Sequence, residues 1–439
     1  MIIDKITYND LSIFNGDEEQ QSIFDYLNLT ATNGGREQLH IMYNEPLQSI
    51  EAITARQQVL QYIETNTHTW PTQISNGTII MIEKFYATAV DAIPSHPNVM
   101  SATNYKAFNN SDYSLIKFSV THFVDFFKGL QLLVTNYIAD APPLLATKLH
   151  RINTLITNHR QLQHLIDVKD KEKISAVDVL EFGHFFKGRF KVECFELLDT
   201  YNLLDAWCSM ALAKVKYNLN YPNFIASTTA QLNANNLFHV MLPTPVAYNV
   251  TLQKSENFLF LTGANMAGKS TYIKAVGIAV FLAHLGMAVP ATTMQLSLFD
   301  GLLSNIQVAD NISKGESYFF NEVQRIKNTV QKINNGKKWL VLIDELFKGT
   351  NVQDAMKCST AVIKGLIKID NSIFILSTHL YEIGEALKQH HNITFKYFET
   401  FATDGQLQFS YVLKDGISND RLGYLILQRE GVVDLLESL

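Results

Sequence analysis

The 439-residue chain contains only three cysteines and no long apolar run. The cysteines, Cys194, Cys208 and Cys358, have neither the spacing of a metal site nor the density of a disulfide framework, which indicates a reduced, cytoplasmic environment. The longest apolar run, residues 275–283, is far shorter than a membrane span. The first ten residues lack the basic and apolar regions of a signal peptide. The sequence therefore predicts a cytoplasmic protein without membrane segments.

An excess of basic charge is absent as well. The formal net charge of −6 supplies no global field for nucleic acid, so any such contact must come from a local patch. Hydrophobic residues make up 47% of the chain and charged residues 18%, a composition too apolar for disorder and sufficient for large cores. At this length we expect two or three domains.

The first half of the sequence has helical patterns. Residues 113–138 carry apolar side chains at alternating spacings of four and three residues, which predicts a long amphipathic helix. Further helices are predicted at residues 144–166 and 191–217. We therefore expect a helical domain over residues 1–237.

The pattern changes near residue 238. Short β-like runs follow at residues 238–242, 247–252 and 258–261. Two later runs, residues 339–343 and 372–377, are continuously apolar and alternate with helical patterns. Such runs predict strands buried on both faces of a parallel sheet that is covered by helices. The sequence as a whole thus predicts an α + α/β chain, with an α/β domain over residues 238–439.

A phosphate-binding pattern follows the run at 258–261. Gly263-x-x-x-x-Gly268-Lys269-Ser270 stands between this strand and a helix that begins near Thr271, which is the context of a P-loop and makes a chance match improbable. The two glycines let successive N–H groups face one concavity, and the helix dipole adds positive potential there. Lys269 would reach the β- and γ-phosphates, and Ser270 would bind Mg²⁺. The expected ATP-binding residues are Gly263, Ala264, Asn265, Met266, Ala267, Gly268, Lys269, Ser270 and Thr271.

Acidic residues and a histidine end the two later strands. Asp344 and Glu345 follow residues 339–343, at the edge where an open α/β sheet binds its ligand. Asp344 would hold Mg²⁺ opposite Ser270, and Glu345 would orient or deprotonate the attacking water. His379 follows the next strand and could sense the γ-phosphate or stabilise transition-state charge, although alone it would be an ordinary polar loop residue.

A further candidate is Ser317, which opens the helix that carries Phe319 and Glu322. Spacing alone favours an N-cap role for this serine. The alternative is that it binds phosphate, because an exposed helix N-terminus is also a good anion site.

With these motifs assembled, the chain resembles the MutS family of DNA mismatch-repair ATPases. Its P-loop, with Asn265-Met266 inside, is similar to that of the family. Other matching segments are Val289-Pro-Ala291, Asp310, Ser317-x-Phe319-x-x-Glu322, Leu342 to Leu346 with Gly349-Thr350, Thr378-His379, Tyr411 to Gly416, Leu27 to Thr30, Gly34 to Arg36, Asp205 and Tyr221-Pro222.

The resemblance implies an ABC-like P-loop NTPase domain that uses ATP and Mg²⁺, with a dimerisation segment at its C-terminus. Two such domains would pair face to face in a homodimer, so that Ser317 reaches the γ-phosphate held by the other chain. Asn265 becomes a phosphate contact, while Lys269, Glu345 and His379 form the catalytic group. DNA and repair proteins are the implied partners, and the ATP state would set the angle between helical levers.

The sequence also departs from the family pattern. Ala264 and Ala267 stand where proline and glycine are usual, and Phe347-Lys348 replaces a usual Gly-Arg. The chain begins at the core domain, so we expect the mismatch-reading and connector domains to be absent and the DNA clamp to be reduced or missing. The alternative function is therefore a nucleotide-switched interaction scaffold without direct mismatch recognition. An ABC-type or chromosome-organising ATPase would instead carry a Leu-Ser-Gly-Gly-like signature and a long coiled coil, and neither is found in the sequence.

Overall fold

The computed structural model describes residues 1–14, 21–306, 318–403, 406–418 and 431–437. These residues form two compact units. The helical unit comprises Leu27–Asn44 and Thr54–Lys216, and the sheet unit comprises Met1–Tyr26, Glu45–Ile53 and Tyr217–Leu439. The linear boundary that we predict at residue 237 therefore differs from this division, because the N-terminal segment and residues 217–237 belong to the sheet unit. None of the described helices is long and apolar enough to cross a membrane.

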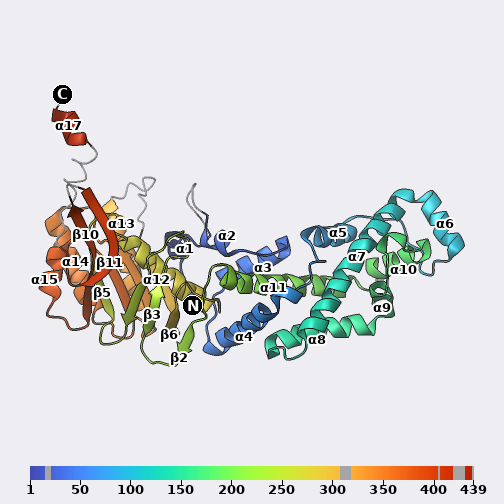
Figure 1. Ribbon diagram of the computed structural model, residues 1–439, viewed down its shortest axis with the longest axis horizontal. Coiled ribbons are helices and arrows are strands. Elements are labelled where there is room, and N and C mark those ends of the chain that lie inside the picture. Colours follow the sequence, from blue (N-terminus) through green and yellow to red (C-terminus); the bar gives the residue numbers. More distant parts are fainter. Residues whose placement is uncertain (15–20, 307–317, 404–405, 419–430, 438–439) are drawn as a thin grey trace. The chain divides into compact units, whose positions relative to one another are not determined.

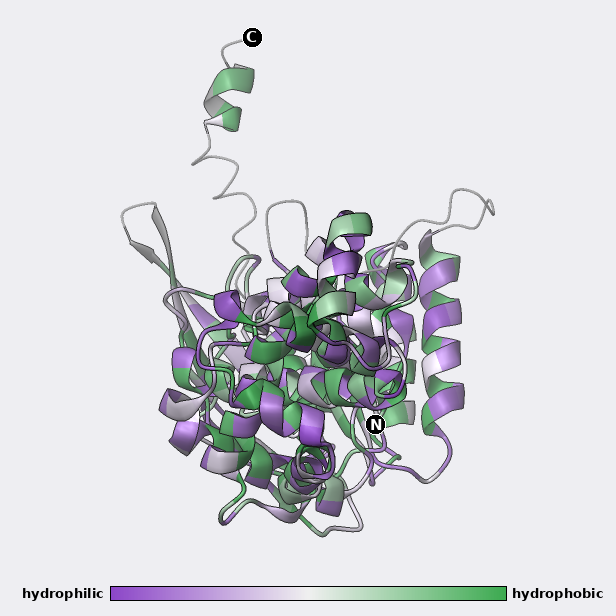
Figure 2. Cartoon of the chain, turned by 90° about the vertical axis from the view of Figure 1, so that its right-hand side faces the viewer, coloured by the Kyte–Doolittle hydropathy of each residue, from purple (hydrophilic) through white to green (hydrophobic). Residues whose placement is uncertain are grey.

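The helical unit is built from long amphipathic helices (Figure 1). In chain order they are α3 (Asn33–Asn44), α4 (Ile50–Asn66), α5 (Asn76–Ala87), α6 (Val99–Phe108), α7 (Asn110–Tyr137), α8 (Pro143–Asn158), α9 (Arg160–Ile166), α10 (Ala176–Lys187) and α11 (Lys191–Lys216), with 3₁₀ turns η1 (Thr67–Thr69) and η2 (Lys171–Lys173). Figure 2 shows helices on which hydrophobic and hydrophilic residues alternate, as expected for helices with one buried face.

Helix α7 forms the centre of this unit and confirms the periodicity of residues 113–138. All seven apolar positions of the predicted stripe are buried: Ile116, Val120, Phe123, Phe127, Leu130, Val134 and Tyr137. The ring of Phe123 stacks on Phe186 of α10 with 3.8 Å between centroids. The predicted helix at 144–166 is interrupted, because His159 is extended (φ −118, ψ 110) and separates α8 from α9.

A buried carboxylate joins the two ends of the helical unit. Asp205 of α11 accepts hydrogen bonds from the backbone N–H groups of Ala31 and Thr32, at 3.0 and 2.9 Å, and from the Thr32 hydroxyl. A Cβ atom on Gly35 would lie 2.1 Å from the Asp205 carboxylate, so a side chain there would displace α3. Asp205 and Gly35 both belong to segments that match the family pattern, and packing accounts for both of them.

The sheet unit contains a seven-stranded sheet in the order β1-β7-β8-β9-β5-β10-β11. Its strands are β1 (Ile2–Ile3), β5 (Phe258–Thr262), β7 (Gly301–Asn305), β8 (Trp339–Asp344), β9 (Ile373–Ser377), β10 (Ile393–Thr403) and β11 (Gln406–Asp415). All neighbouring pairs are parallel except β10 and β11. Every residue of β5, β8 and β9 is buried, as the continuous apolar runs predict.

A second sheet and several helices complete this unit. The four strands β2 (Asn223–Ile225), β6 (Thr293–Ser297), β3 (Leu232–Leu237) and β4 (Tyr248–Leu252) pair in that order. The prediction of a strand at residues 238–242 is wrong, because β3 ends at Leu237 and a turn follows. The helices are α1 (Lys5–Asp10), α2 (Ile23–Leu27), α12 (Lys269–His284), α13 (Tyr318–Ile333), α14 (Val352–Leu366), α15 (Tyr381–Leu387) and α17 (Val432–Glu437). The α + α/β architecture with a mainly parallel sheet is thus confirmed.

Candidate nucleotide site

The P-loop connects β5, an interior strand of the seven-stranded sheet, to α12. Two glycines have backbone conformations that suit glycine alone, with φ of 137° at Gly263 and 105° at Gly268, where α12 is capped. A Cβ on Gly263 would lie 3.2 Å from the carbonyl oxygen of Phe398 on β10. The loop is therefore turned tightly against the neighbouring strand, and the N-terminus of α12 opens at its mouth.

Lys269 and Ser270 begin α12 and point to different partners. The Lys269 Nζ donates to the carbonyl oxygens of Gly263 and Ala264, both at 2.8 Å. Burial lowers the pKa of Lys269 to about 8, although the carboxylates of Glu345 and Asp344 act in the opposite direction. The Ser270 hydroxyl donates to Oδ2 of Asp344 at 2.5 Å.

Asp344 is the last residue of β8 and is buried. Its Oδ1 accepts a hydrogen bond from the hydroxyl of Ser377, which pairs with it in register at the end of β9. Sequence reasoning assigned no role to Ser377. The signal that could have identified it is its position at the C-terminal end of the adjacent parallel strand, since such ends meet at one edge of a sheet.

Glu345 adopts a left-handed backbone conformation with φ of 63°, which is uncommon for a residue with a side chain. Its N–H donates to the carbonyl of Ser377 at 2.9 Å. One carboxylate oxygen lies 2.8 Å from Nε2 of His379, and the other lies 3.1 Å from Nζ of Lys348. Burial raises the pKa of Glu345, but His379 and then Lys348 outweigh it and lower this pKa to about 2.

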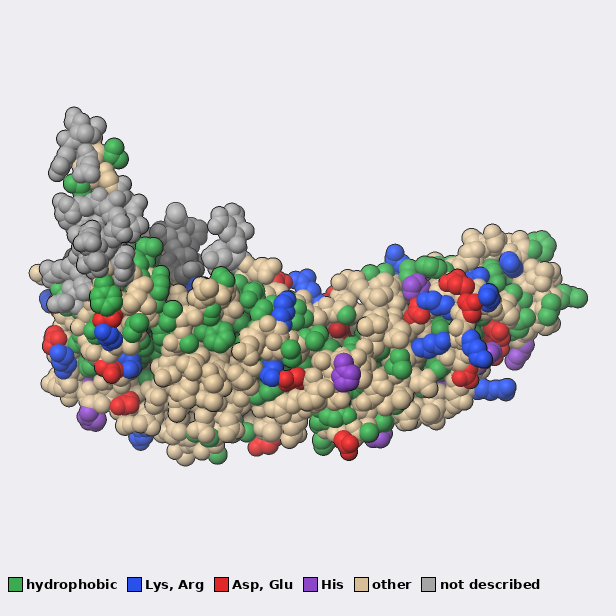
Figure 3. Space-filling model, in the orientation of Figure 1, with side chains coloured by type: hydrophobic (Ala, Val, Ile, Leu, Met, Phe, Trp, Pro, Cys, Tyr) green, Lys and Arg blue, Asp and Glu red, His purple; other side chains and the backbone are tan. Residues whose placement is uncertain are grey.

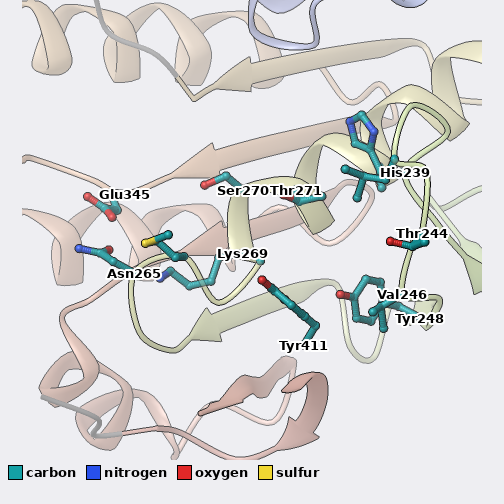
Figure 4. A pocket seen from close by; sticks show the side chains of 14 residues that line it. His239, Thr244, Val246, Tyr248, Asn265, Lys269, Ser270, Thr271, Glu345 and Tyr411 are labelled. Atoms are coloured by element: carbon teal, nitrogen blue, oxygen red, sulfur yellow. The ribbon is translucent and has the colours of Figure 1, made fainter. Parts of the chain in front are cut away.

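Of these residues, Lys269, Ser270 and Glu345 line a cavity of about 450 Å³ (Figure 4). Part of its lining is P-loop residues that the sequence predicts, together with Glu345; the rest is residues that it does not predict. The predicted lining residues are Asn265, Met266, Gly268, Lys269, Ser270, Thr271 and Glu345, and the unpredicted ones include His239, Thr244, Val246, Tyr248 and Tyr411. His379 lies outside this cavity and lines a smaller one of about 160 Å³ with Glu345 and Lys348.

The unpredicted residues are mainly apolar or aromatic. Tyr248 comes from β4, and Tyr411, with φ of 54°, comes from β11. Burial, and next the charge of Lys274, lowers the pKa of His239 to about 4, so its imidazole is neutral at pH 7. The sequence pattern gives none of them a role in the site, because two segments far apart in the chain, residues 239–248 and β11, bring them together.

Helix α13 supports the loop that follows Asp344. The carboxylate of Glu322 accepts the N–H groups of Lys348 and Gly349, both at 3.1 Å. Ser317 and Asp310 lie outside the described residues, so the structure tests neither of them. Glu322 was part of the family pattern, but no role had been assigned to it.

Comparison with known proteins identifies the sheet unit. Residues 259–434 match the model of MutS domain V. Over these residues the chain is similar to the MutS family. The match begins in β5 and includes the P-loop, Asp344, Glu345 and His379. The oxygen atoms gathered around Ser270 thus lie inside the part of the chain that the family defines.

Three curated relatives support this similarity. DNA mismatch repair protein MutS of Pseudothermotoga lettingae is 28% identical over 232 residues, which are 52% of this chain and 28% of that protein. MutS of Aquifex pyrophilus is 31% identical over 185 residues, 42% of this chain and 21% of that protein. DNA mismatch repair protein MSH3 of Vanderwaltozyma polyspora is 31% identical over 257 residues, 55% and 25%. The matched segments thus span between a fifth and three tenths of the relatives' lengths.

Proposed function

We propose that this chain binds ATP with Mg²⁺, hydrolyses it, and uses the nucleotide state to control an interaction with DNA. The observation that carries the proposal is that Lys269, Ser270 and Glu345 line one cavity, with Asp344 hydrogen-bonded to Ser270 behind it. The relatives named above are mismatch-repair proteins, and DNA binding is extended to this chain from them.

The P-loop fits a polyphosphate. Positive φ at Gly263 and Gly268 curves the backbone, and the free N–H groups at the start of α12 favour an anion. The buried Lys269 ammonium is held at the loop by two carbonyl oxygens and is positioned to exchange them for phosphate oxygens. A cavity of about 450 Å³ has the size of sites that bind molecules of this class.

The adjoining oxygen atoms fit Mg²⁺. The Ser270 hydroxyl and the Asp344 carboxylate are 2.5 Å apart, and both are ligand types that this ion prefers. The described residues contain no cluster of three or more His, Cys, Asp or Glu side chains that could enclose a metal. Such a sparse protein set suits an ion that takes its other ligands from phosphates and water. When bound, Mg²⁺ would neutralise charge on the phosphate oxygens.

Glu345 is assigned to the water that attacks the γ-phosphate. It stands at the end of β8 between the two cavities, where its carboxylate can accept a proton from a water molecule. His379 lies 2.8 Å from the same carboxylate and can orient it. The aromatic side chains Tyr248 and Tyr411, which line the larger cavity, suit the purine ring.

Replacing Glu345 with glutamine tests this assignment. Glu345→Gln should still bind ATP but hydrolyse it about 100-fold more slowly, because the amide cannot take the proton of the water. Turnover at the wild-type rate in a single-turnover assay would show that Glu345 does not activate water.

A composite site in a homodimer is the second part of the proposal. Ser317 is proposed to contact the γ-phosphate bound by the partner chain. A mixture of Ser317→Arg and Lys269→Ala chains should then regain part of the lost ATPase activity, since one intact composite site can form. Activity that stays at the level of the separate variants would instead assign Ser317 to an N-cap.

A nucleotide-switched protein scaffold remains a second candidate, and the charge of the helical unit favours it. This unit has 17 Lys and Arg against 16 Asp and Glu. Figure 3 shows basic and acidic side chains mixed over its visible face. Binding of duplex, mismatched and branched DNA should be measured at about 50 mM salt, where phosphate contacts are strong. No measurable affinity for any of the three would favour the scaffold.

A further inference from the structure

The loop from Glu345 to Gly349 is held in an unusual conformation. Glu345 and Phe347 both have left-handed backbones, with φ of 63° and 61°. Residues with side chains keep this conformation only where their surroundings enforce it. The contacts that enforce it come from α13, which faces the loop.

Helix α13 holds the loop through backbone and side chain. Glu322 is buried, and its two carboxylate oxygens accept the N–H groups of Lys348 and Gly349. A Cβ on Gly349 would lie 2.7 Å from the backbone nitrogen of Phe319, so helix and loop meet in close contact. The buried ring of Phe347 packs against Phe319 with 5.7 Å between centroids. A shift of α13 must therefore move residues 347–349.

Lys348 links the loop that α13 holds to the carboxylate of Glu345. Its Nζ lies 3.1 Å from Oε2 of Glu345, while Nε2 of His379 lies 2.8 Å from Oε1. Both carboxylate oxygens are thus directed towards side-chain partners. Because the ammonium is attached to the loop that Glu322 fixes, the position of α13 decides whether this ion pair can persist.

We propose that Lys348 is a positioning residue that restrains Glu345 within its own chain, and that α13 controls the restraint through Glu322. This inference rests on the proposed ATPase function. In the restrained site Lys348 holds the Glu345 carboxylate, so ATP is hydrolysed slowly. Displacement of α13 withdraws Lys348 and leaves Glu345 free to accept the proton of the attacking water. Helix α13 therefore acts on the site of its own chain.

The test is steady-state ATPase activity of the full chain with saturating Mg-ATP. Lys348→Met keeps most of the side-chain length but removes the charge, so kcat should rise about fivefold while KM stays within about twofold. Lys348→Arg should return kcat towards the wild-type value, because it restores a cation. Glu322→Gln keeps one acceptor oxygen and should raise kcat by a smaller factor, provided that its thermal unfolding matches that of the wild type.

The matched control is Lys357→Met, which removes an exposed lysine from α14 and should leave kcat unchanged. Lys348→Met should also have no effect in a Glu345→Gln background, since the carboxylate that Lys348 restrains is then absent. A fall in kcat for Lys348→Met would overturn the inference and make Lys348 a stabiliser of the transition state; an unchanged kcat would also overturn it.

The outcomes separate this inference from the function beneath it. If wild-type hydrolysis depends on Glu345 but Lys348→Met does not accelerate it, only the restraint is wrong. If hydrolysis does not depend on Glu345, both the assignment of Glu345 and the restraint are wrong.

Discussion

The helical unit and the sheet unit differ in how many of their residues adopt an unfavourable backbone conformation. Among the described residues with side chains, eight have positive φ, and only Asp140 belongs to the helical unit. Four of the other seven, Met266, Glu345, Phe347 and Tyr411, line one of the two cavities at the P-loop. Strained backbone conformations persist where they hold a side chain in a functional position. Packing accounts for the helical unit, whereas the sheet unit keeps strained residues that line the two cavities.

The two units also differ in their balance of acidic and basic residues. The helical unit has one more basic than acidic residue, and several of its charges are paired, as in Arg151–Glu196 and Lys214–Glu64. The sheet unit has 19 basic and 26 acidic residues, yet it contains the proposed anion site. Phosphate binding there must come from local geometry rather than from net charge.

Lys269→Ala should give the largest difference between the two units. Removing the ammonium from the P-loop should weaken ATP binding at least about 1000-fold, or about 4 kcal/mol. The helical unit should be unaffected, because the Lys269 ammonium donates to carbonyl oxygens of the P-loop, within the sheet unit. Isothermal titration with Mg-ATP measures the loss, and Lys357→Met is the control for removal of a lysine. Retained affinity would show that the cavity does not bind the polyphosphate through the P-loop.

Phe123→Ala reverses the pattern of effects. The ring is fully buried and stacks on Phe186, so its loss should lower the free energy of unfolding by about 3–5 kcal/mol. Affinity for ATP should not change, since the stack belongs to the helical unit. Urea denaturation monitored by circular dichroism measures the first quantity. The control is Phe118→Ala on the same helix, where the side chain is 53% exposed and the cost should stay below about 1 kcal/mol.

The sequence predicts local features of both units well. The α7 stripe and the strands β5, β8 and β9 depend on periodicity and burial, which a short window contains. The sequence also predicts that Asp344, Glu345 and the P-loop lie close together, because the C-terminal ends of parallel strands meet at one edge of a sheet. Two predictions that the structure contradicts are local as well: β3 lies before residue 238, and α8 ends at Asn158 without a proline or glycine to mark it.

The remaining features depend on which segments meet. Strand β1 has only two residues, too few for a pattern, and it is defined by pairing with β7. Tyr411 reaches the cavity because β11 pairs with β10 beside β5. The contact of Glu322 with Lys348 spans 26 residues and depends on how α13 packs. None of these follows from spacing, because each requires the strand order or helix packing first.

Acid should destabilise the sheet unit through a histidine that no site uses. His284 ends α12, is fully buried, donates to the carbonyl of Val280 through Nδ1 and accepts the N–H of Phe299 through Nε2. Burial lowers its pKa to about 4, against about 6.5 when unfolded. Between these values the unfolded chain binds more protons, so stability falls as the pH drops from 6.5 to 4, by about 3 kcal/mol.

Urea unfolding at several pH values measures this slope, followed through a signal from the sheet unit. His284→Gln can keep a donor and an acceptor but does not titrate, so it should flatten the dependence between pH 6.5 and 4. An equal slope in both proteins would assign the acid sensitivity to other groups. The Phe123→Ala variant should keep the wild-type slope, which separates the two units again.

Tyr411→Ala should have the smallest effect and sharpens the comparison inside the sheet unit. Tyr411 lines the cavity beside the P-loop, and its ring is proposed to contact the base of the nucleotide. Loss of the ring should weaken ATP binding about tenfold, the size expected for one stacking contact. Binding of inorganic triphosphate should not change, because that ligand has no base. Tyr411→Phe keeps the ring and should bind both ligands as the wild type does. Equal weakening of ATP and triphosphate by Tyr411→Ala would mean that the ring supports the P-loop, since a Cβ at Gly268 would lie 3.4 Å from Tyr411.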